Sequence, residues 1–250
     1  MTLSFLGTGT STGVPVIGCD CETCTSPDPR DKRLRASVLL EDESHSVLID
    51  PGPDFRQQAL RANIKHLDAI LVTHLHYDHI GGLDDVRPLG NIDVYADEIS
   101  QEAIHRCLPY CFGPNPYPGS PRIWLHDIKE NTPIQLGTWS IEPLRVMHGK
   151  LPIFGFRIGK LAYLTDVKTI PQQTYDKLHG LDTLVINGLR HEPHPAHISI
   201  EEAVEIARQI GARMTYLTHF AHTASRHEVL EQMLPHSIRP AYDGLTLEVK

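Results

Sequence analysis

Short apolar runs recur along the chain and predict buried strands. Each run is four or five residues long and is rich in β-branched and aliphatic side chains, which suits strands inside a sheet better than helices. The predicted strands cover residues 3–6, 36–40, 46–49, 69–72, 92–95, 161–164, 183–186, 214–217 and 245–249.

Four segments with apolar residues at helical spacing lie between these strands, over residues 55–61, 97–108, 199–210 and 226–233. Ser199, followed three residues later by Glu202, is a capping-box signal for the start of the third helix. Strands follow one another without a helix around residues 36–49 and 139–164, so the order is not a simple βαβ repeat. The pattern therefore predicts an α/β fold of layered sheets with helices outside.

One segment, residues 109–121, is rich in proline and glycine and predicts a surface loop. A connector is the favoured interpretation, and a lid or a dimer contact is the alternative. The sequence shows no internal repeat, and 250 residues fit one large domain, so we expect a single domain over residues 1–250.

Composition and charge narrow the function classes. A hydrophobic fraction of 40% and a charged fraction of 22% are typical of a folded globular protein. The net charge of -8 disfavours a nucleic-acid partner, so a small anionic substrate would need local positive charge such as metal ions. An odd number of cysteines, the lack of a basic leader and the lack of a long apolar stretch predict a cytoplasmic protein without a membrane partner.

The strongest chemical signal is His74-x-His76-x-Asp78-His79, which directly follows the predicted strand 69–72. Four side chains of metal-ligating type within six residues, on a loop after a strand, are positioned to converge on a metal ion. A solvated surface is a poor alternative explanation for this density. One loop cannot complete two coordination spheres, so further ligands are expected elsewhere.

Further ligand types do follow other predicted strands: His148, Asp166 and His219. Taken singly, each fits a turn residue or a satisfied polar group. Their shared placement beyond strand ends argues for one common site. Separately, Cys19, Cys21 and Cys24 resemble a structural zinc site that lacks one ligand, with reduced buried cysteines as the alternative.

The histidine and aspartate set resembles the two-metal hydrolases of the metallo-β-lactamase superfamily. The resemblance implies a four-layer αβ/βα sandwich and a hydroxide that bridges two divalent metals, Mn or Zn, about 4 Å apart. It also implies that Asp50 orients a ligand histidine. The implied ligands are His74, His76 and His148 for one metal, Asp78, His79 and His219 for the second, and Asp166 as the bridge.

The glycine-rich opening, residues 7–15, and the cysteine cluster after it resemble the PhnP family of cyclic-phosphate phosphodiesterases. This resemblance implies a cysteine-rich zinc loop at about residues 18–35, with His222 as the fourth ligand. It suggests a homodimer, and it makes His197 the candidate general acid alongside the catalytic Asp78. His191 and His194 compete for that role, because residues 190–197 depart from the family pattern in detail.

The implied function is hydrolysis of a small cyclic phosphodiester, of the phosphoribosyl 1,2-cyclic phosphate or 2′,3′-cyclic nucleotide type. Arg87 and Arg190 are candidates for holding phosphate, with solvated surface charge equally expected for each. The alternatives are a tRNA 3′-end-processing nuclease and a non-catalytic binding protein resembling PqqB. Gly7, Gly9 and Gly13 are interpreted as turn formers rather than as a phosphate loop.

Overall fold

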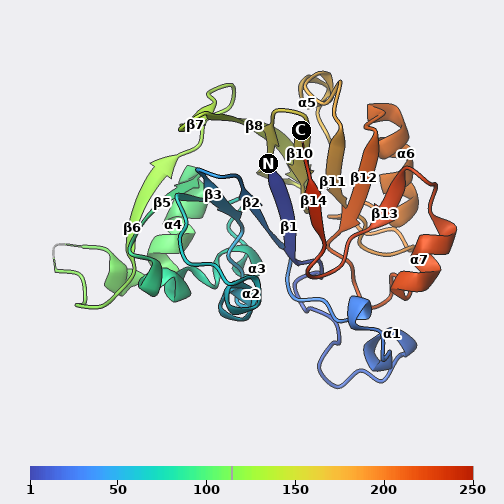
Figure 1. Ribbon diagram of the computed structural model, residues 1–250, viewed down its shortest axis with the longest axis horizontal. Coiled ribbons are helices and arrows are strands. Elements are labelled where there is room, and N and C mark those ends of the chain that lie inside the picture. The colour runs from blue at the N-terminus through green and yellow to red at the C-terminus, as the bar shows by residue number, and fades with distance from the viewer. Residues whose placement is uncertain (114, 250) are drawn as a thin grey trace.

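Two seven-stranded sheets form the centre of the molecule. The structure is a computed structural model that describes residues 1–113 and 115–249. The first sheet has the order β14-β1-β2-β3-β4-β5-β6, and the second has the order β13-β12-β11-β10-β9-β8-β7. Figure 1 shows the strands in the middle, with α2, α3 and α4 on one side and α6 and α7 on the other.

In the first sheet the strands change from antiparallel to parallel pairing. β1 pairs antiparallel with β14 and β2, and β2 pairs antiparallel with β3, whereas β3, β4, β5 and β6 run parallel. The strand bounds are β1 Thr2–Gly7, β2 Ser37–Glu41, β3 Ser46–Ile49, β4 Ala69–Leu71, β5 Asn91–Ala96, β6 Arg122–Asp127 and β14 Thr246–Glu248.

The second sheet repeats this change of pairing. β7, β8, β9 and β10 are antiparallel neighbours, and β10, β11, β12 and β13 run parallel. The bounds are β7 Ile134–Leu136, β8 Trp139–His148, β9 Leu151–Ile158, β10 Leu161–Leu164, β11 Thr183–Asn187, β12 Met214–Thr218 and β13 Ile238–Pro240. Each sheet thus has parallel strands whose carboxyl ends open at one edge.

Three apolar layers hold the sheets and helices together. The central layer packs one sheet on the other, through side chains such as Phe5, Phe154 and Tyr163. The outer layers pack helices α2 and α4 on the first sheet and helix α6 on the second. The helix bounds are α1 Glu22–Thr25, α2 Phe55–Ala62, α3 Tyr77–Ile80, α4 Glu98–Cys107, α5 Gln172–Asp176, α6 Ile200–Ile210 and α7 His227–Met233, with 3₁₀ turns η1 Pro29–Asp31, η2 Leu83–Leu89 and η3 Pro109–Cys111.

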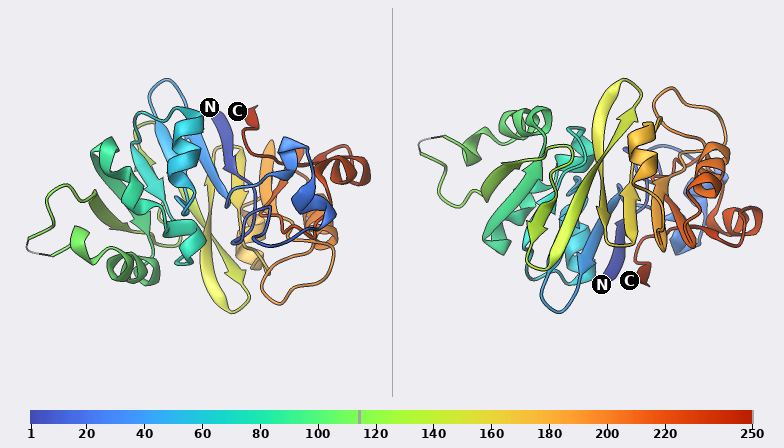
Figure 2. Two further views of the ribbon diagram at one scale, coloured as in Figure 1. Left: turned by 90° about the horizontal axis from the view of Figure 1, so that it is seen from below. Right: turned by 90° about the horizontal axis from the view of Figure 1, so that it is seen from above.

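The order of layers is helix, sheet, sheet, helix, which confirms the predicted α/β four-layer αβ/βα sandwich. The two views in Figure 2 show this layering from below and from above, with the two chain ends side by side. The ends meet because β1 pairs with β14. The prediction of one domain over residues 1–250 stays a prediction.

Local predictions agree best where a cap marks the element. Ser199 and Glu202 form the predicted capping box at the start of α6. Residues 109–121 hold only the 3₁₀ turn η3 among their described positions, as expected for a loop, and position 114 lies outside the described residues. The predicted strand ranges do not include β8 and β9, which fall in the region 139–164 where successive strands were expected. They also missed β6, β7 and β13, of which β7 and β13 are three residues long and β6 carries exposed polar side chains.

No helix in the described part of the chain, residues 1–113 and 115–249, has the length and apolar character required to cross a membrane.

Candidate metal centres

The predicted His/Asp residues all lie where strands end. Asp50 follows β3, the His74 to His79 loop follows β4, and His148 is the last residue of β8. Asp166 and His219 come one or two residues after β10 and β12. Backbone hydrogen bonds join the two sheets here, as from Phe154 N to Thr73 O at 3.0 Å. Because these strand ends meet, residues 145 positions apart in sequence reach one place.

The ligand atoms form one continuous cluster, hereafter the His/Asp cluster. Its atoms fall into overlapping groups in which all members lie within 4.8 Å of one another: His74, His76 and His148; His74, His79 and Asp166; Asp78, His79 and His219. Asp166 Oδ2 is 3.3 Å from His79 Nε2 and 3.2 Å from His219 Nε2. The carboxylate of Asp166 therefore lies between the groups, as a bridging ligand would.

Hydrogen bonds to neighbouring groups fix the orientation of two histidines in the cluster, His79 and His148. Asp50 Oδ2 accepts from His79 Nδ1 at 2.8 Å, and Asp50 Oδ1 accepts from the Thr73 amide at 2.8 Å. His148 Nδ1 donates to the Ala196 carbonyl at 2.7 Å. In both histidines Nδ1 is the donor, so the Nε2 lone pair is free to bind a cation.

The chemistry of the donors fits divalent metal ions. The Nε2 atom of His79 and both ring nitrogens of His219 are buried and have no hydrogen-bond partner within the described residues. Three residues of the site, Asp50, Asp166 and His219, have φ values of 56° to 59° without being glycine. Backbone strain of this kind persists where the surrounding structure holds it for a function. A metal pair would satisfy the orphaned nitrogens.

Charge around the cluster favours cations. Burial opposes ionisation of Asp78 and Asp166, but the adjacent His79 and His219 hold the pKa of both carboxyls below their usual range. Burial likewise opposes a proton on His79, yet Asp50, Asp166 and Asp78 raise its pKa well above the ordinary value. The carboxylates thus create a negative potential at the place where metals would bind.

Two residues that support the site, Asn187 and Thr165, were not predicted from the sequence. Asn187, the buried last residue of β11, accepts from the Val167 amide at 2.7 Å and donates to the Val167 carbonyl at 3.2 Å. Thr165 Oγ1 donates to Asp166 Oδ2 at 2.8 Å. These contacts hold the Asp166 turn in place. The signal was present, because Asn187 also follows an apolar run at a strand end, as the ligands do.

Among the three candidate acids, the structure brings His197 to the cluster. His197 Nδ1 is 3.5 Å from Asp166 Oδ1, and its ring centroid is 4.5 Å from that of His148. His194 packs on the outer side, 5.0 Å from the His197 ring. His191 bonds elsewhere, to Glu201 at 2.7 Å. Burial lowers the pKa of His197 to about 3, against the opposing effect of Asp166.

A second cluster joins the cysteine-rich loop to the chain after β12. His222 Nδ1 is 3.3, 3.4 and 3.6 Å from the sulfurs of Cys19, Cys21 and Cys24. A tetrahedral zinc ion at ordinary bond lengths separates sulfur and nitrogen by about 3.6 Å. The Cys24 amide and His222 lower the pKa of Cys21 to about 6, which favours the thiolate that zinc requires.

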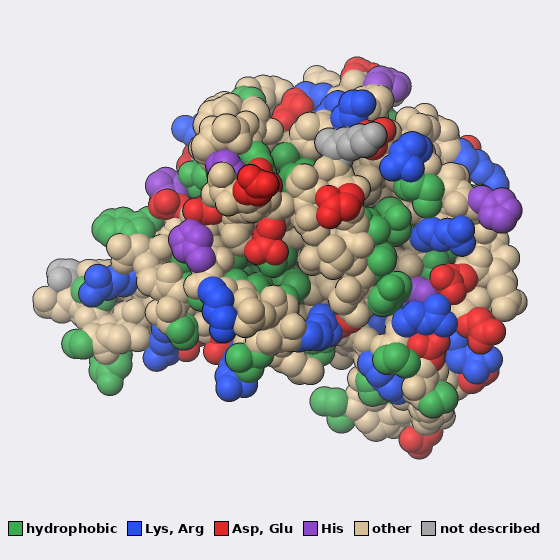
Figure 3. All heavy atoms as spheres, in the orientation of Figure 1, with side chains coloured by type: hydrophobic (Ala, Val, Ile, Leu, Met, Phe, Trp, Pro, Cys, Tyr) green, Lys and Arg blue, Asp and Glu red, His purple; other side chains and the backbone are tan. Residues whose placement is uncertain are grey.

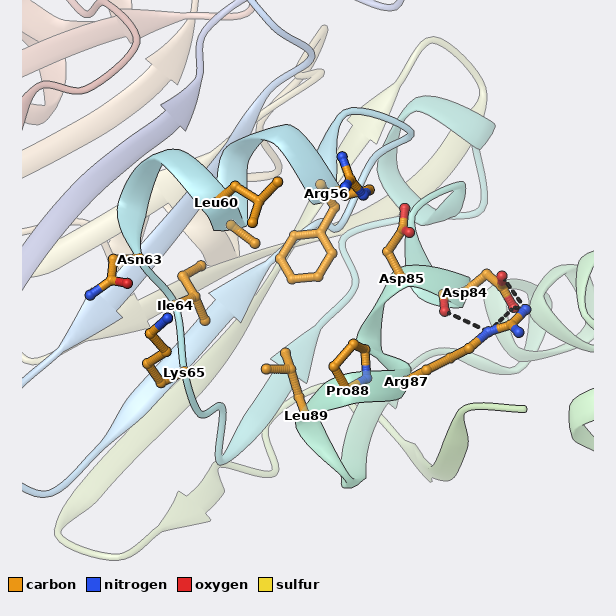
Figure 4. A pocket seen from close by; sticks show the side chains of 12 residues that line it. Arg56, Leu60, Asn63, Ile64, Lys65, Asp84, Asp85, Arg87, Pro88 and Leu89 are labelled. Atoms are coloured by element: carbon orange, nitrogen blue, oxygen red, sulfur yellow. Dashed lines mark hydrogen bonds and ion pairs between the residues drawn. The ribbon is translucent and has the colours of Figure 1, made fainter. Parts of the chain in front are cut away.

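The two arginines predicted to hold phosphate, Arg87 and Arg190, lie in different parts of the molecule. Arg87 pairs with Asp84 in a groove of about 610 Å³ between α2 and η2, none of whose lining residues belongs to the His/Asp cluster (Figure 4). Arg190 lies in the loop after β11, four residues before His194. On the face shown in Figure 3, acidic and basic side chains are interspersed, without a continuous basic stripe.

The glycines of the opening segment differ in role. A Cβ on Gly7 would lie 1.9 Å from the Arg35 carbonyl, and one on Gly9 would lie 2.9 Å from the Arg33 carbonyl. The interpretation as turn formers is therefore wrong for Gly7 and Gly9, which permit close backbone approach instead. Gly13, with a φ of 64°, does need the freedom of glycine for its turn.

Comparison with known proteins agrees with this geometry. The sequence profile of the beta-lactamase superfamily domain matches residues 45–220. The chain belongs to the metallo-β-lactamase superfamily. A crystal structure of a diphosphatase from the PhnP family superposes with a TM-score of 0.93 at 43% identity, over 100% of this chain and 98% of that one.

Two curated relatives add context. The chain is 46% identical over 250 residues to an octanoyltransferase of Porphyromonas gingivalis, and the match covers 98% of this chain but only 51% of that protein. It thus spans about half the length of that relative. Ribonuclease Z of Mycobacterium sp. (strain KMS) is 25% identical over 230 residues, covering 78% of this chain and 81% of that protein.

Proposed function

We propose that the protein is a metal-dependent phosphodiesterase that hydrolyses a small cyclic phosphodiester. The chain is a hydrolase of the metallo-β-lactamase superfamily with a site for divalent metals. The observation that carries the finer proposal is the contact of His197 with Asp166 at the edge of the His/Asp cluster. This contact supports the proposal, because a phosphodiesterase needs a side chain near its metal site that can give a proton to the leaving oxygen.

The proposed ligand roles follow the groups of atoms described above. His74, His76 and His148 would hold one metal; Asp78, His79 and His219 would hold the second, with Asp166 shared. When bound, such a metal pair supplies Lewis acidity and lowers the pKa of a water molecule. Mn and Zn both suit imidazole and carboxylate ligands.

The remaining residues orient and transfer protons. Asp50 holds His79 through Nδ1, and the Ala196 carbonyl holds His148, so each ligand ring is fixed before substrate arrives. Hydrolysis adds the oxygen of water to phosphorus and breaks the bond to one ester oxygen, which leaves as an alkoxide. His197 would give that oxygen its proton, so the ring opens to a single product that carries both a phosphomonoester and a free hydroxyl group.

One assay tests the proposal. Purified protein with counted metal content is given bis(p-nitrophenyl) phosphate, phosphoribosyl 1,2-cyclic phosphate and a 2′,3′-cyclic nucleotide. Turnover of a cyclic diester by the metal-loaded protein is the expected result. No turnover of any diester despite full metal loading would contradict it.

A diphosphate is the second candidate substrate, because the similar PhnP-family structure is that of a diphosphatase. A dinucleoside diphosphate in the same assay separates the two, since its leaving group is a nucleoside monophosphate rather than an alkoxide. The ribonuclease Z relative keeps tRNA 3′ ends as a further alternative. The net charge of -8 opposes it, and a steep fall of tRNA binding with salt would revive it.

The name octanoyltransferase does not carry over, because that relative is about twice as long as the matched region. The predicted homodimer and the structural zinc in the cysteine-rich loop stay proposals. Metal counting and sedimentation of the same preparation test both.

A further inference from the structure

The ring of His219 has no hydrogen bond to orient it within the described residues. Both of its ring nitrogens are buried and lack a hydrogen-bond partner there. By contrast, His79 is held by Asp50, and His148 is held by the Ala196 carbonyl. The backbone of His219 is also strained, with a φ of 59°. The position of this ligand must therefore be fixed through the chain on either side of it.

The backbone on both sides of His219 is tied to neighbouring segments. After it, the Phe220 amide donates a hydrogen bond to the Thr8 carbonyl at 2.9 Å. Before it, the Leu217 carbonyl accepts from the Ala241 amide at 2.8 Å. The place of His219 therefore depends on how the segments that carry Thr8 and Ala241 lie relative to each other.

One buried arginine, Arg33, contacts both of these segments and the residue after His219. The side chain is 3% exposed, and Nη1 donates to Thr8 Oγ1 at 2.8 Å and to the Ala241 carbonyl at 2.6 Å. The Arg33 Cζ atom lies 4.5 Å from the centroid of the Phe220 ring, within the range of a cation–π contact. A single guanidinium thus joins the supports on both sides of the ligand.

The charge of Arg33 is costly to bury. Its hydrogen bonds within residues 1–113 and 115–249 go to uncharged groups, the third being His227 Nδ1 at 3.4 Å. Burial lowers the pKa of Arg33 to about 10, against the opposing effects of Asp243 and Asp31, so the guanidinium stays charged at neutral pH. An apolar side chain would fill the same space without that cost. The contacts that the planar fork makes therefore account for an arginine here better than filling of space does.

We infer that Arg33 is a positioning residue for His219 and sets the affinity of the metal ion that His219 holds. The inference rests on the metal ligands of the proposed function and not on its substrate. The guanidinium fixes the segments of Thr8 and Ala241 relative to each other, and the Phe220 ring against it restrains the strained turn. Arg33 therefore acts through the backbone beside the ligand rather than on the metal itself.

The test measures metal affinity rather than turnover. Protein stripped of metal at the His/Asp cluster is titrated with Mn²⁺, which thiolates do not favour, and free Mn²⁺ is counted from its EPR signal. In Arg33→Met, one of the two dissociation constants should rise by about 10- to 100-fold, the range for groups that support a ligand. It should be the constant that His219→Ala raises most, and the other constant should stay unchanged.

Matched variants separate positioning from stability. Arg157, near the end of β9, also donates to backbone carbonyls, those of Gly159 at 3.0 Å and of Lys177. Arg157→Met should change neither constant, even where Tm falls. Arg33→Lys keeps a charge near the Phe220 ring and should restore part of the affinity. If Arg33→Met does not fold, Phe220→Leu removes the ring from the same contact and should raise the same constant.

The contrary results are distinct. A rise in both constants together with a lower Tm would mean that Arg33 only stabilises the fold, and two unchanged constants would mean that it does not act on His219. Either result overturns the inference and leaves the proposed function standing. A wild-type protein that does not bind two Mn²⁺ ions would overturn the metal pair of the proposed function, and the inference with it.

Discussion

The His/Asp cluster and the cysteine cluster are built in opposite ways. The first gathers residues from 74 to 219 at strand ends of both sheets, and most of them are buried. The second takes three ligands from one short loop and a fourth from His222, and three of its four members are only half-buried. The His/Asp cluster therefore depends on the whole fold, whereas the cysteine cluster attaches one loop to the rest of the molecule.

The ligand types differ in the same direction. Three sulfurs and one imidazole fill a tetrahedral zinc site, which leaves no position for substrate. Imidazoles with shared carboxylates suit a pair of ions with open positions. We therefore expect chemistry at the His/Asp cluster and stability at the cysteine cluster. The two are nevertheless linked, because His219 and His222 are three residues apart.

Removing the carboxylate of Asp166 should show the largest difference between the two clusters, because it should affect the His/Asp cluster and not the cysteine cluster. Asp166→Asn takes the charge from the position between His79 and His219, so activity should fall by about 10⁴-fold, the scale for groups that act as a unit. Metal analysis should show loss from the His/Asp cluster and one retained zinc. Asp127→Asn, an exposed aspartate, is the control. Retained activity would remove Asp166 from the site.

Removing the proposed acid should act on chemistry without loss of metal. His197→Ala should slow substrates with alkoxide leaving groups by about 10²- to 10⁴-fold and leave p-nitrophenyl esters nearly unaffected. A p-nitrophenolate leaves without a proton, which is why the two substrates should differ. Exposed His236→Ala serves as control. If metal content falls instead, His197 acts as a ligand with His148 and Asp166, a group that the geometry also allows.

Weakening the support of a ligand should have a smaller effect. Asp50→Asn removes the charge that orients His79, so metal affinity should fall by about 10- to 100-fold. Competition with a fluorescent chelator measures this affinity. Asp93→Asn at the exposed Asp93–His126 pair is the matched control. An unchanged metal affinity in Asp50→Asn would mean that the buried Asp50–His79 pair has only a structural role.

Opening the cysteine cluster should cost stability more than catalysis. Cys21→Ser should lower Tm by roughly 5–10 °C, because a structural zinc contributes to folding. Activity per folded chain should stay within about 3-fold, since the His/Asp ligands remain. Exposed Cys107→Ser is the control, and calorimetry is the measurement. An unchanged Tm would contradict a zinc site there.

The sequence predicted the local features of these clusters better than the long-range ones. The His74 to His79 loop and the three cysteines can be recognised from the sequence, because their ligands are close together along the chain. Placing His148 and Asp166 in the same site needed the rule that strand ends meet. No local signal distinguishes His197 from His194 and His191, because only the packing of the loop on β8 decides which ring reaches Asp166.

The fold shows the same limit. Buried strands were visible as apolar runs, whereas β6 has exposed side chains on one face and shows no continuous run. The close approaches at Gly7 and Gly9 depend on residues Arg33 and Arg35, whose distance from the glycines is set by sheet pairing. Such contacts are properties of the assembled structure, and a single sequence does not reveal them.

The most direct test of the account is a chelator titration of metal-loaded protein, with metal content and phosphodiesterase activity followed together. We expect activity to disappear as two metals per chain leave, while one zinc remains bound to the cysteine cluster. Activity that persists after those two metals are gone, or that tracks loss of the cysteine-bound zinc alone, would contradict it.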